Sequence, residues 1–410
     1  MQPRNAATAQ CSHRGRPAGW PALHNERVDT RRDVAVVLSG GGINGVLLEL
    51  GFLKRLRESP LWPRIGCIFG TSAGAVTGTS AALDRLDELE RFLFSLRPED
   101  TFRPQRLWRT PLLGLNDYTL PQTIAERLGD PTELAGDLAR SPVELVVCAT
   151  DVTDDGPGEH RYELTYSSRT TPPEVMGQAV LASAAISALV FPLRVGDRIA
   201  TDGGWVRNYP LGNAYDRPEV ATIVAFRYVP EYRRLSAEPL ARLRERLQRM
   251  RAVPPVRAFV EELREAEERE ARGEPMHLVD MLVRLMRVSI QRNTELEERS
   301  AELRDASVRE LAALRADVLE LVSEHARPAR RRAAAGAVER RFAAARFPFR
   351  HDRELPRITV RATAGPESLE PSFRNQRPWT DKAKRSLIDR GYELTDAVLR
   401  AEGITEPLAS

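Results

Sequence analysis

The sequence predicts an α/β fold in which helices cover a mostly parallel central sheet, with an added helical region. Short apolar runs of strand length alternate with stretches of helical spacing, which is the pattern of βαβ units joined by right-handed crossovers. The run 34–38 is apolar on both faces, as a parallel strand buried between helices is. Charge density rises after residue 230, which indicates helices added to the sheet domain.

The elements follow in order along the chain. A glycine-rich turn, 39–45, separates the first strand from a helix at 46–57, where apolar residues recur every three or four positions. The strand 67–69 runs into a second turn of small residues, and a helix leads from it to about residue 83. Further strands are expected at 144–150, 198–201, 220–226 and 357–362, a hairpin at 151–166, and helices at 174–188 and 380–400.

Four regions are predicted from these elements. They are a flexible N-terminal arm over 1–32, the core over 33–230, a charged helical region over 231–350, and a closing strand with the C-terminal helix of the core over 351–410. In the third region, 277–292 and 295–325 are amphipathic, which favours helices packed on one face of the sheet. Alternatives are a membrane-surface or partner-binding helix and a coiled coil. The basic stretch 327–350 is typical of a solvated face, with anionic-lipid contact as its alternative.

Composition excludes several classes of protein. Of the 410 residues, 42% are hydrophobic and 29% are charged, which is the balance of a globular chain and not of a disordered or collagen-like one. The net charge of +3 gives no argument for nucleic acid, and none is expected. Cys11, Cys67 and Cys148 are too far apart for a zinc motif or a disulfide framework, which favours a reducing compartment. No run suits a membrane span or signal peptide, so we expect a cytoplasmic protein with peripheral membrane contact.

A candidate nucleophile lies on the turn after the second strand. The run from Gly70 through Ser72 to Gly74 fits the G-x-S-x-G elbow, in which a strained serine between strand and helix projects its hydroxyl. The flanking positions must be small because the neighbouring backbone passes close by. The helix N-terminus also favours negative charge on the serine oxygen. Taken alone, the pentapeptide fits a packing turn equally well.

The first glycine-rich turn has the same strand–loop–helix setting. It reads Gly40-Gly41-Gly42-Ile43-Asn44-Gly45. Backbone N–H groups of successive glycines can converge on an anion. One interpretation is a dinucleotide site, which requires an acidic residue at the end of the next strand, but Glu58 is the nearest acid and lies elsewhere. The favoured interpretation is an oxyanion hole beside the Ser72 turn.

An activated serine needs a base, and Asp202 is the favoured candidate. It follows a predicted strand, and Gly203 and Gly204 after it allow the chain to turn closely. A carboxylate becomes a useful base when it is shielded from water and bonded to the hydroxyl. On its own, Asp202 also fits an ordinary turn. A histidine-containing triad would need His325 or His351, and neither lies in a strand-end loop.

Four segments, in this order, resemble the patatin-like phospholipase family. They are the turn 40–45 with its helix, the elbow 70–74, the run 182–192, whose small-residue helix stops before Phe-Pro, and the turn 202–204. The resemblance extends over about residues 33–226 and implies a patatin-like three-layer α/β acyl hydrolase that uses a serine–aspartate dyad without histidine. Asn44 departs from the family, which usually has arginine or lysine there.

The resemblance also implies roles for these residues. Ser72 would be the nucleophile, Asp202 its base, and the loop of Gly40, Gly41 and Gly42 the oxyanion hole. The expected reaction is hydrolysis of a lipid carboxylic ester, a phospholipid or related acyl lipid, through an acyl-enzyme, with no cofactor and no metal. The expected partners are the lipid substrate and a membrane surface. The alternative is a catalytically quiet scaffold that binds a membrane or protein through its charged helices.

Overall fold

The computed structural model has a main eight-stranded sheet with helices on both faces. The described residues are 31–104, 116–153, 162–186, 190–231, 241, 244–245, 247–248, 254–274, 278–347, 349, 354–369 and 379–404. The chain divides into two units, residues 1–31 and residues 32–410, and the sheet belongs to the second. The expected N-terminal arm and the tip of the expected hairpin, 154–161, lie outside the described residues.

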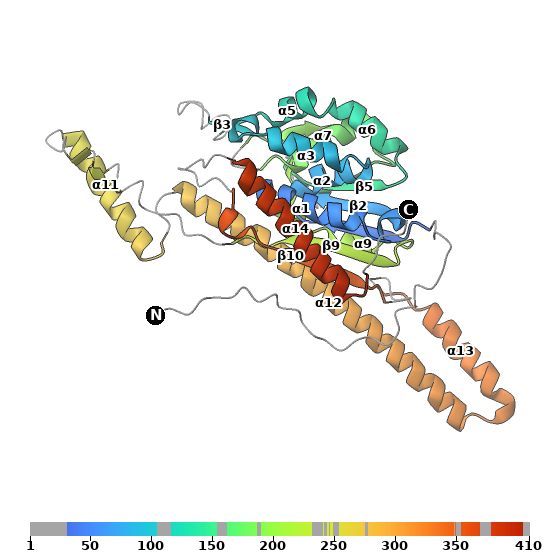
Figure 1. The fold of residues 1–410 in the computed structure, drawn as a ribbon. Helices are drawn as coiled ribbons and strands as arrows, with labels where there is room; N and C mark the ends of the chain where they lie inside the picture. The colour runs from blue at the N-terminus through green and yellow to red at the C-terminus, as the bar shows by residue number, and fades with distance from the viewer. Residues whose placement is uncertain are drawn as a thin grey trace. The chain divides into compact units, whose positions relative to one another are not determined.

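The strands are ordered β10-β9-β1-β2-β5-β8-β7, and β6 pairs with β5 (Figure 1). Neighbouring strands from β10 to β5 run parallel, whereas β6 and β8 are antiparallel to β5. The predicted mostly parallel sheet is thereby confirmed. The strands are β1 (Val34–Leu38), β2 (Ile65–Thr71), β5 (Glu144–Asp151), β6 (Glu163–Ser167), β7 (Leu193–Val195), β8 (Arg198–Asp202), β9 (Thr222–Tyr228) and β10 (Arg357–Ala362). A separate two-stranded sheet contains β3 (Phe102–Pro104) and β4 (Asn116–Tyr118).

The helices are distributed along the whole chain. Those of the core are α1 (Gly42–Arg57), α2 (Ala73–Ala82), α3 (Leu86–Ser95), α5 (Leu120–Arg127), α6 (Pro131–Arg140), α7 (Pro173–Ser183), α8 (Gly204–Arg207) and α9 (Leu211–Tyr215). Later come α11 (Pro254–Ala271), α12 (Leu278–His325), α13 (Arg331–Ala343) and α14 (Asp381–Ala401). Among the described residues, no helix combines the length and apolar character needed to cross a bilayer.

Alternation along β1 divides the hydrophobic core into two layers. Val34, Val36 and Leu38 pack with α1, α2 and α14 on one face of the sheet. Ala35 and Val37 face the other side, where the buried residues come from α9, α12 and neighbouring segments. Successive side chains of a strand point to opposite faces, so a strand apolar throughout is buried on both. The expected three layers are present.

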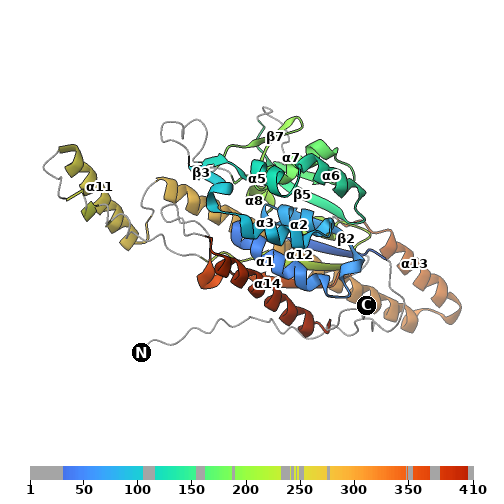
Figure 2. The ribbon, with the colours of Figure 1, turned by 45° about the horizontal axis from the view of Figure 1, so that its top comes forward.

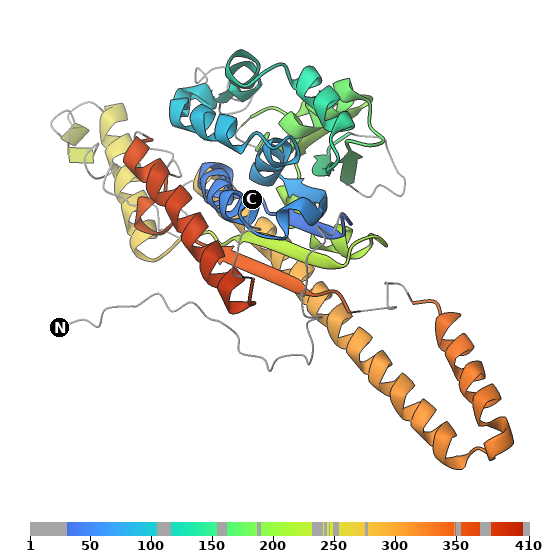
Figure 3. The same ribbon diagram turned by 45° about the vertical axis from the view of Figure 1, so that its right-hand side comes forward.

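Two helices differ from the sequence-based expectation. Helix α1 begins at Gly42, four residues before the predicted start, so the glycine turn itself forms the helix N-terminus. The two predicted amphipathic stretches are one continuous helix of 48 residues, α12. Figure 3 shows α12 running along the side of the sheet formed by β9 and β10. Nothing in the sequence between the two stretches breaks a helix, which explains the continuity.

The C-terminal helix packs across α1 through glycine contacts (Figure 2). A Cβ atom at Gly51 would lie 2.0 Å from the Ile388 carbonyl oxygen, and one at Gly391 would lie 2.1 Å from the Leu48 carbonyl oxygen. These distances are too short for a side-chain carbon atom at either position. The backbones of α1 and α14 can approach this closely because both positions are glycine.

We predict that Gly391→Ala destabilises the fold by at least about 2 kcal/mol, since the added methyl must displace backbone atoms of α1. The matched control is Gly136→Ala on α6, where a Cβ meets no atom closer than 3.8 Å. That substitution should stabilise the fold by up to about 1 kcal/mol because alanine favours the helix. Urea unfolding measures both changes, and equal stabilities for the two variants would contradict the packing argument.

Candidate active site

Ser72 occupies a strained turn between β2 and α2. Its backbone has φ 56° and ψ −116°, in the left-handed half of the map that non-glycine residues rarely enter. The turn is possible because its flanks are glycines. A Cβ at Gly70 would lie 2.2 Å from the Gly74 carbonyl oxygen, and one at Gly74 would lie 2.5 Å from the Leu38 carbonyl oxygen. The motif therefore has the elbow geometry that its spacing predicts.

Asp202 lies directly beside this serine. The Ser72 hydroxyl donates a hydrogen bond of 2.6 Å to Oδ2 of Asp202. Strand β5 lies between the two parent strands: Thr71 is opposite Cys148, and Asp202 is opposite Ala149. Two residues 130 positions apart thus meet across a single strand.

The turn after Asp202 fixes the carboxylate. The Gly204 N–H donates to Oδ1 of Asp202 at 2.6 Å. A Cβ at Gly203 would lie 2.3 Å from the Cys148 carbonyl oxygen, so a side chain there would push the turn away from β5. A Cβ at Gly204 would lie 2.8 Å from Oδ1 of Asp202, so both glycines that follow the aspartate have a structural reason. Each carboxylate oxygen has a donor.

Burial dominates the electrostatics of this pair. Ser72 and Asp202 are each only 6% exposed. Removal from water raises the pKa of Asp202 to about 6, although the hydrogen bonds from Ser72 and Gly204 work in the opposite direction. An acid with a pKa near neutrality can accept and return a proton at physiological pH. The geometry thus brings together a hydroxyl and a carboxylate suited to proton transfer.

The glycine turn lies against the serine, but one of its amides is already occupied. A Cβ at Gly40 would lie 3.2 Å from the Cβ of Ser72, so the turn is in contact with the elbow. The Gly40 N–H donates to the Asn208 carbonyl oxygen at 2.9 Å. In this geometry the Gly40 amide, expected as an oxyanion donor, is engaged by Asn208. Within the described part of the chain, the N–H groups of Gly41 and Gly42 have no acceptor.

Asn44, where a cation was expected from the family pattern, is a fully buried structural residue. Its Nδ2 donates to the Ser368 hydroxyl at 2.9 Å, and its Oδ1 accepts the Leu369 N–H at 2.8 Å. The side chain therefore joins the first turn of α1 to a segment more than 300 residues later. Gly45, next to it, donates to the Gly41 carbonyl and lets α1 approach Ala73.

Ser183 is a site residue whose role sequence reasoning missed. Its hydroxyl accepts the Ser72 N–H at 2.9 Å and donates to the Cys148 carbonyl oxygen at 2.7 Å, and it is fully buried. The Ser72 amide is therefore engaged. Ser183 lies in the run 182–192, which matched the family only as a small-residue helix, and residues 187–189 of that run are outside the described residues. The sequence signal that could have indicated this role is a polar residue at the buried end of that helix.

Of the alternative residues, His325 and Glu58 lie in the described part of the chain, and both are away from this site. His325 ends α12, 31 residues after Thr294, whose hydroxyl accepts a hydrogen bond from Asn208 in the site region; at 1.5 Å per residue the separation is about 46 Å along the helix. His351 lies outside the described residues. Glu58, the acid considered for a dinucleotide site, ends α1 at its far end and accepts the Tyr392 hydroxyl.

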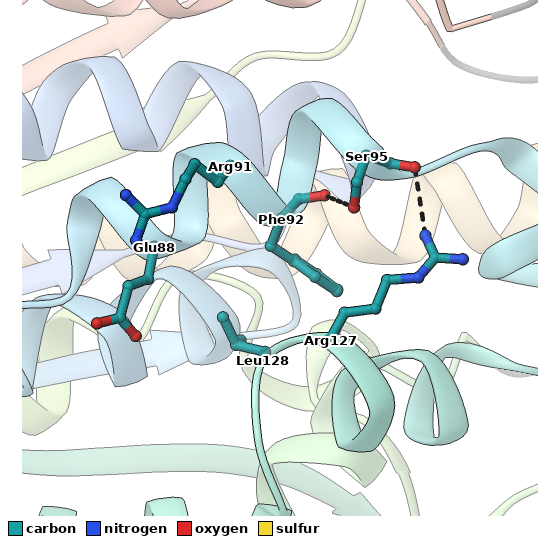
Figure 4. Close-up of a pocket in the computed structure, with 6 residues that line it drawn as sticks. All are labelled: Glu88, Arg91, Phe92, Ser95, Arg127 and Leu128. Carbon is teal, nitrogen blue, oxygen red and sulfur yellow. Dashed lines mark hydrogen bonds between the residues drawn. The ribbon is translucent and has the colours of Figure 1, made fainter.

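Other hollows and clusters do not extend the site. A hollow of about 330 Å³ lies between α3 and α5 and shares no residue with the Ser72 site. Among its lining residues, Arg127 donates to the Ser95 carbonyl oxygen (Figure 4). In the described ranges, no three histidine, cysteine, aspartate or glutamate side chains gather as metal ligands would.

Fold and site together define an α/β domain with a serine–carboxylate pair at a strained, glycine-flanked turn. Residues 36–215 match the family model described as Patatin-like phospholipase, which confirms the resemblance seen in the sequence. This part of the chain, less than half of the 410 residues, is similar to the patatin-like phospholipase family, whose members are lipid acyl hydrolases.

Individual relatives are distant. An uncharacterized protein of Acanthamoeba polyphaga mimivirus is 26% identical over 187 residues, which cover 43% of this chain and 59% of that protein. The chain thus matches less than two thirds of this relative's length. The crystal structure of VipD from Legionella pneumophila superposes with a TM-score of 0.40 at 15% identity, over 91% of this chain and 67% of that one.

We predict that Asp202→Asn is more stable than the wild type, and increasingly so as pH rises. The unfolded chain releases this proton near pH 4 and the folded chain near pH 6, so ionisation of the buried carboxyl lowers the free energy of unfolding across that interval. From about pH 5 to about pH 7.5, the variant's advantage should grow by roughly 1–2 kcal/mol.

Urea unfolding at the two pH values measures this change. Asp197→Asn, at an exposed carboxylate on the turn before β8, is the control and should show no such trend. A constant difference between Asp202→Asn and the wild type would show that the carboxyl does not titrate in this interval.

Proposed function

We propose that the protein is a serine acyl hydrolase that cleaves carboxylic esters of phospholipids or related acyl lipids, with Ser72 as nucleophile and Asp202 as its base. The observation that carries the proposal is the 2.6 Å hydrogen bond between the two side chains, at a buried site inside a patatin-like domain. The raised pKa of Asp202 supports it, because a base near neutrality suits proton transfer.

The proposed reaction uses the hydrogen bond between the two side chains as the path of the proton. As Oγ of Ser72 bonds to the ester carbonyl carbon, its proton moves to Oδ2 of Asp202. When the intermediate collapses, the carbon–oxygen bond to the alcohol breaks, and Asp202 returns the proton to that oxygen. Water then attacks the acyl-serine with Asp202 again as base, and the fatty acid and the free hydroxyl are released. Every proton is returned, so no cofactor is required.

The negative oxygen of each intermediate needs donors. The N–H groups of Gly41 and Gly42 support this role, since the turn that carries them contacts Ser72 and forms the N-terminus of α1. The Ser72 amide is bonded to Ser183 and Gly40 to Asn208, so neither is counted. We propose that this pair of glycines forms the oxyanion hole, without a side-chain cation at Asn44.

The substrate class also suggests where the protein acts. A phospholipid is presented at a membrane surface, so the enzyme would contact membranes peripherally. No protein partner and no nucleic acid are part of the proposal.

We predict that Ser72→Ala and Asp202→Asn each lower hydrolysis of a phospholipid by about 10⁴-fold or more, because both act on the same proton transfer. Ser95→Ala and Asp197→Asn remove the same groups outside the site and should retain activity. A lipid-class hydrolysis panel gives the rates and also the preferred head group. A fluorophosphonate probe should label Ser72 of the wild type and of both controls, but should not label Ser72→Ala and should label Asp202→Asn far more slowly.

Two outcomes would count against the proposal. Substantial hydrolysis by Asp202→Asn would remove the carboxylate from the mechanism. No labelling and no hydrolysis by the folded wild type would favour the scaffold that binds partners without catalysis.

A further inference from the structure

The end of α12 and the whole of α13 form a hairpin with an unusual distribution of charge. Helix α13 folds back along the last turns of α12, and Arg315 of α12 pairs with Glu339 of α13 (Figure 3). We call residues 311–347 the distal hairpin. From 326 to 346 it contains one acid, Glu339, and seven exposed arginines: Arg327, Arg330, Arg331, Arg332, Arg340, Arg341 and Arg346.

An apolar hollow lies beside these arginines, at the tip of the hairpin. It measures about 420 Å³ and is lined by Val318, Leu321, Val322, His325 and Ala326. Leu321 is 56% exposed, and Leu314, two turns earlier, is 52% exposed. Exposed leucines next to a dense group of arginines make the tip amphipathic, whereas an ordinary solvated helix would be polar there.

We propose that the distal hairpin docks on an anionic phospholipid surface. The proposal rests on the proposed function, which requires the enzyme to reach lipid in a membrane. Arginines bind phosphate groups through several N–H donors, and their aliphatic stems can lie along acyl chains. The exposed leucines favour lipid over nucleic acid, which offers charge but no apolar layer. Together with Glu339, three acids of α12 (Asp317, Glu320 and Glu324) offset four of the eight arginines, so residues 311–347 have a net charge of +4.

Vesicle sedimentation tests this surface, with Ser72→Ala as the background so that no lipid is cleaved. Binding to mixed phosphatidylcholine–phosphatidylserine vesicles should exceed binding to phosphatidylcholine alone and fall as salt rises. Joint replacement of Arg330, Arg331 and Arg332 by glutamine should weaken it about tenfold or more. The control removes the same charge from three exposed arginines, Arg264 and Arg269 of α11 and Arg272 directly after it, and should bind like the background.

The outcomes separate the explanations. If both triple variants weaken vesicle binding equally, net charge alone explains the effect and the proposed docking surface is overturned. Tighter binding to duplex DNA than to vesicles would also overturn it. Leu321→Ser, which keeps every charge, should also weaken vesicle binding, and it decides the case if the arginine variant does not fold. Retained hydrolysis in Ser72→Ala would defeat the proposed function but leave the binding result intact.

A second, independent observation concerns the first half of α12, outside the residues that match the family model. Asn293 contacts both turns of the site: its Nδ2 donates to the Gly204 carbonyl oxygen at 2.6 Å, and its Oδ1 accepts the Asn208 N–H at 3.2 Å. Thr294, next in the helix, accepts from Nδ2 of Asn208 at 3.1 Å. The carbonyl of Asn208 in turn accepts the Gly40 N–H.

We infer that Asn293 is a positioning residue for the Ser72–Asp202 pair. Its bond to the Gly204 carbonyl oxygen holds the turn whose N–H donates to Asp202. Its bond to the Asn208 N–H holds the residue that accepts the Gly40 N–H of the glycine turn. The inference rests on the proposed function, because the role of α12 would be to align Asp202, the proposed base, with the glycine turn. A misplacement of about 1 Å at such a site can cost about a hundredfold in rate.

The rate constant for fluorophosphonate labelling of Ser72 tests this role. Asn293→Leu keeps a similar volume but loses both bonds, and labelling should slow about tenfold to a hundredfold with its final extent unchanged. Partial unfolding would lower the extent instead. Gln291→Leu on the same helix is the control, because its recorded bond goes only to Glu295. Thr294→Val should slow labelling less, and it is the variant to use if Asn293→Leu does not fold.

Wild-type labelling rates in Asn293→Leu would overturn the positioning role. Absence of labelling in the wild type itself would defeat the proposed function instead.

Discussion

The hydrogen bond between Ser72 and Asp202 is the interaction on which the rest of the site depends. It joins a hydroxyl and a carboxylate that are both almost completely buried, so neither can exchange its partner for water at no cost. The carbonyl of Cys148 on β5 contacts the segments that carry both groups. Ser183 donates to it and accepts the Ser72 N–H, and Gly203, next to Asp202, packs against it. A strand between the two groups therefore sets their distance.

Local patterns were sufficient to find the pair itself. The spacing of glycines around Ser72 and after Asp202 reflects close contacts with neighbouring backbone, and such contacts leave a signature in the sequence. The occupied amide of Gly40 could not be predicted, because its acceptor is Asn208, 168 positions away, and no rule of spacing joins the two. The parallel sheet was predictable because its strands are apolar on both faces, whereas the contacts of α12 depend on tertiary packing.

The chain beyond the family match contributes to the site from two directions. Asn44, in the first turn of α1, is bonded to the segment at Ser368 and Leu369, so the glycine turn is held by the C-terminal part of the chain instead of a cation. Helix α12 approaches from the other side through Asn293 and Thr294. A patatin-like domain cut at residue 215 would lose both sets of contacts.

The central claim is that Asp202 takes the proton from Ser72, and the pH dependence of the fluorophosphonate labelling rate of Ser72 tests it most directly. The account predicts a rate that rises to a single break near pH 6, the pKa to which burial raises Asp202, and is level above it. A rate that instead climbs steadily into the alkaline range with no break near pH 6 would show that the hydroxyl loses its proton without the carboxylate, and would contradict the account.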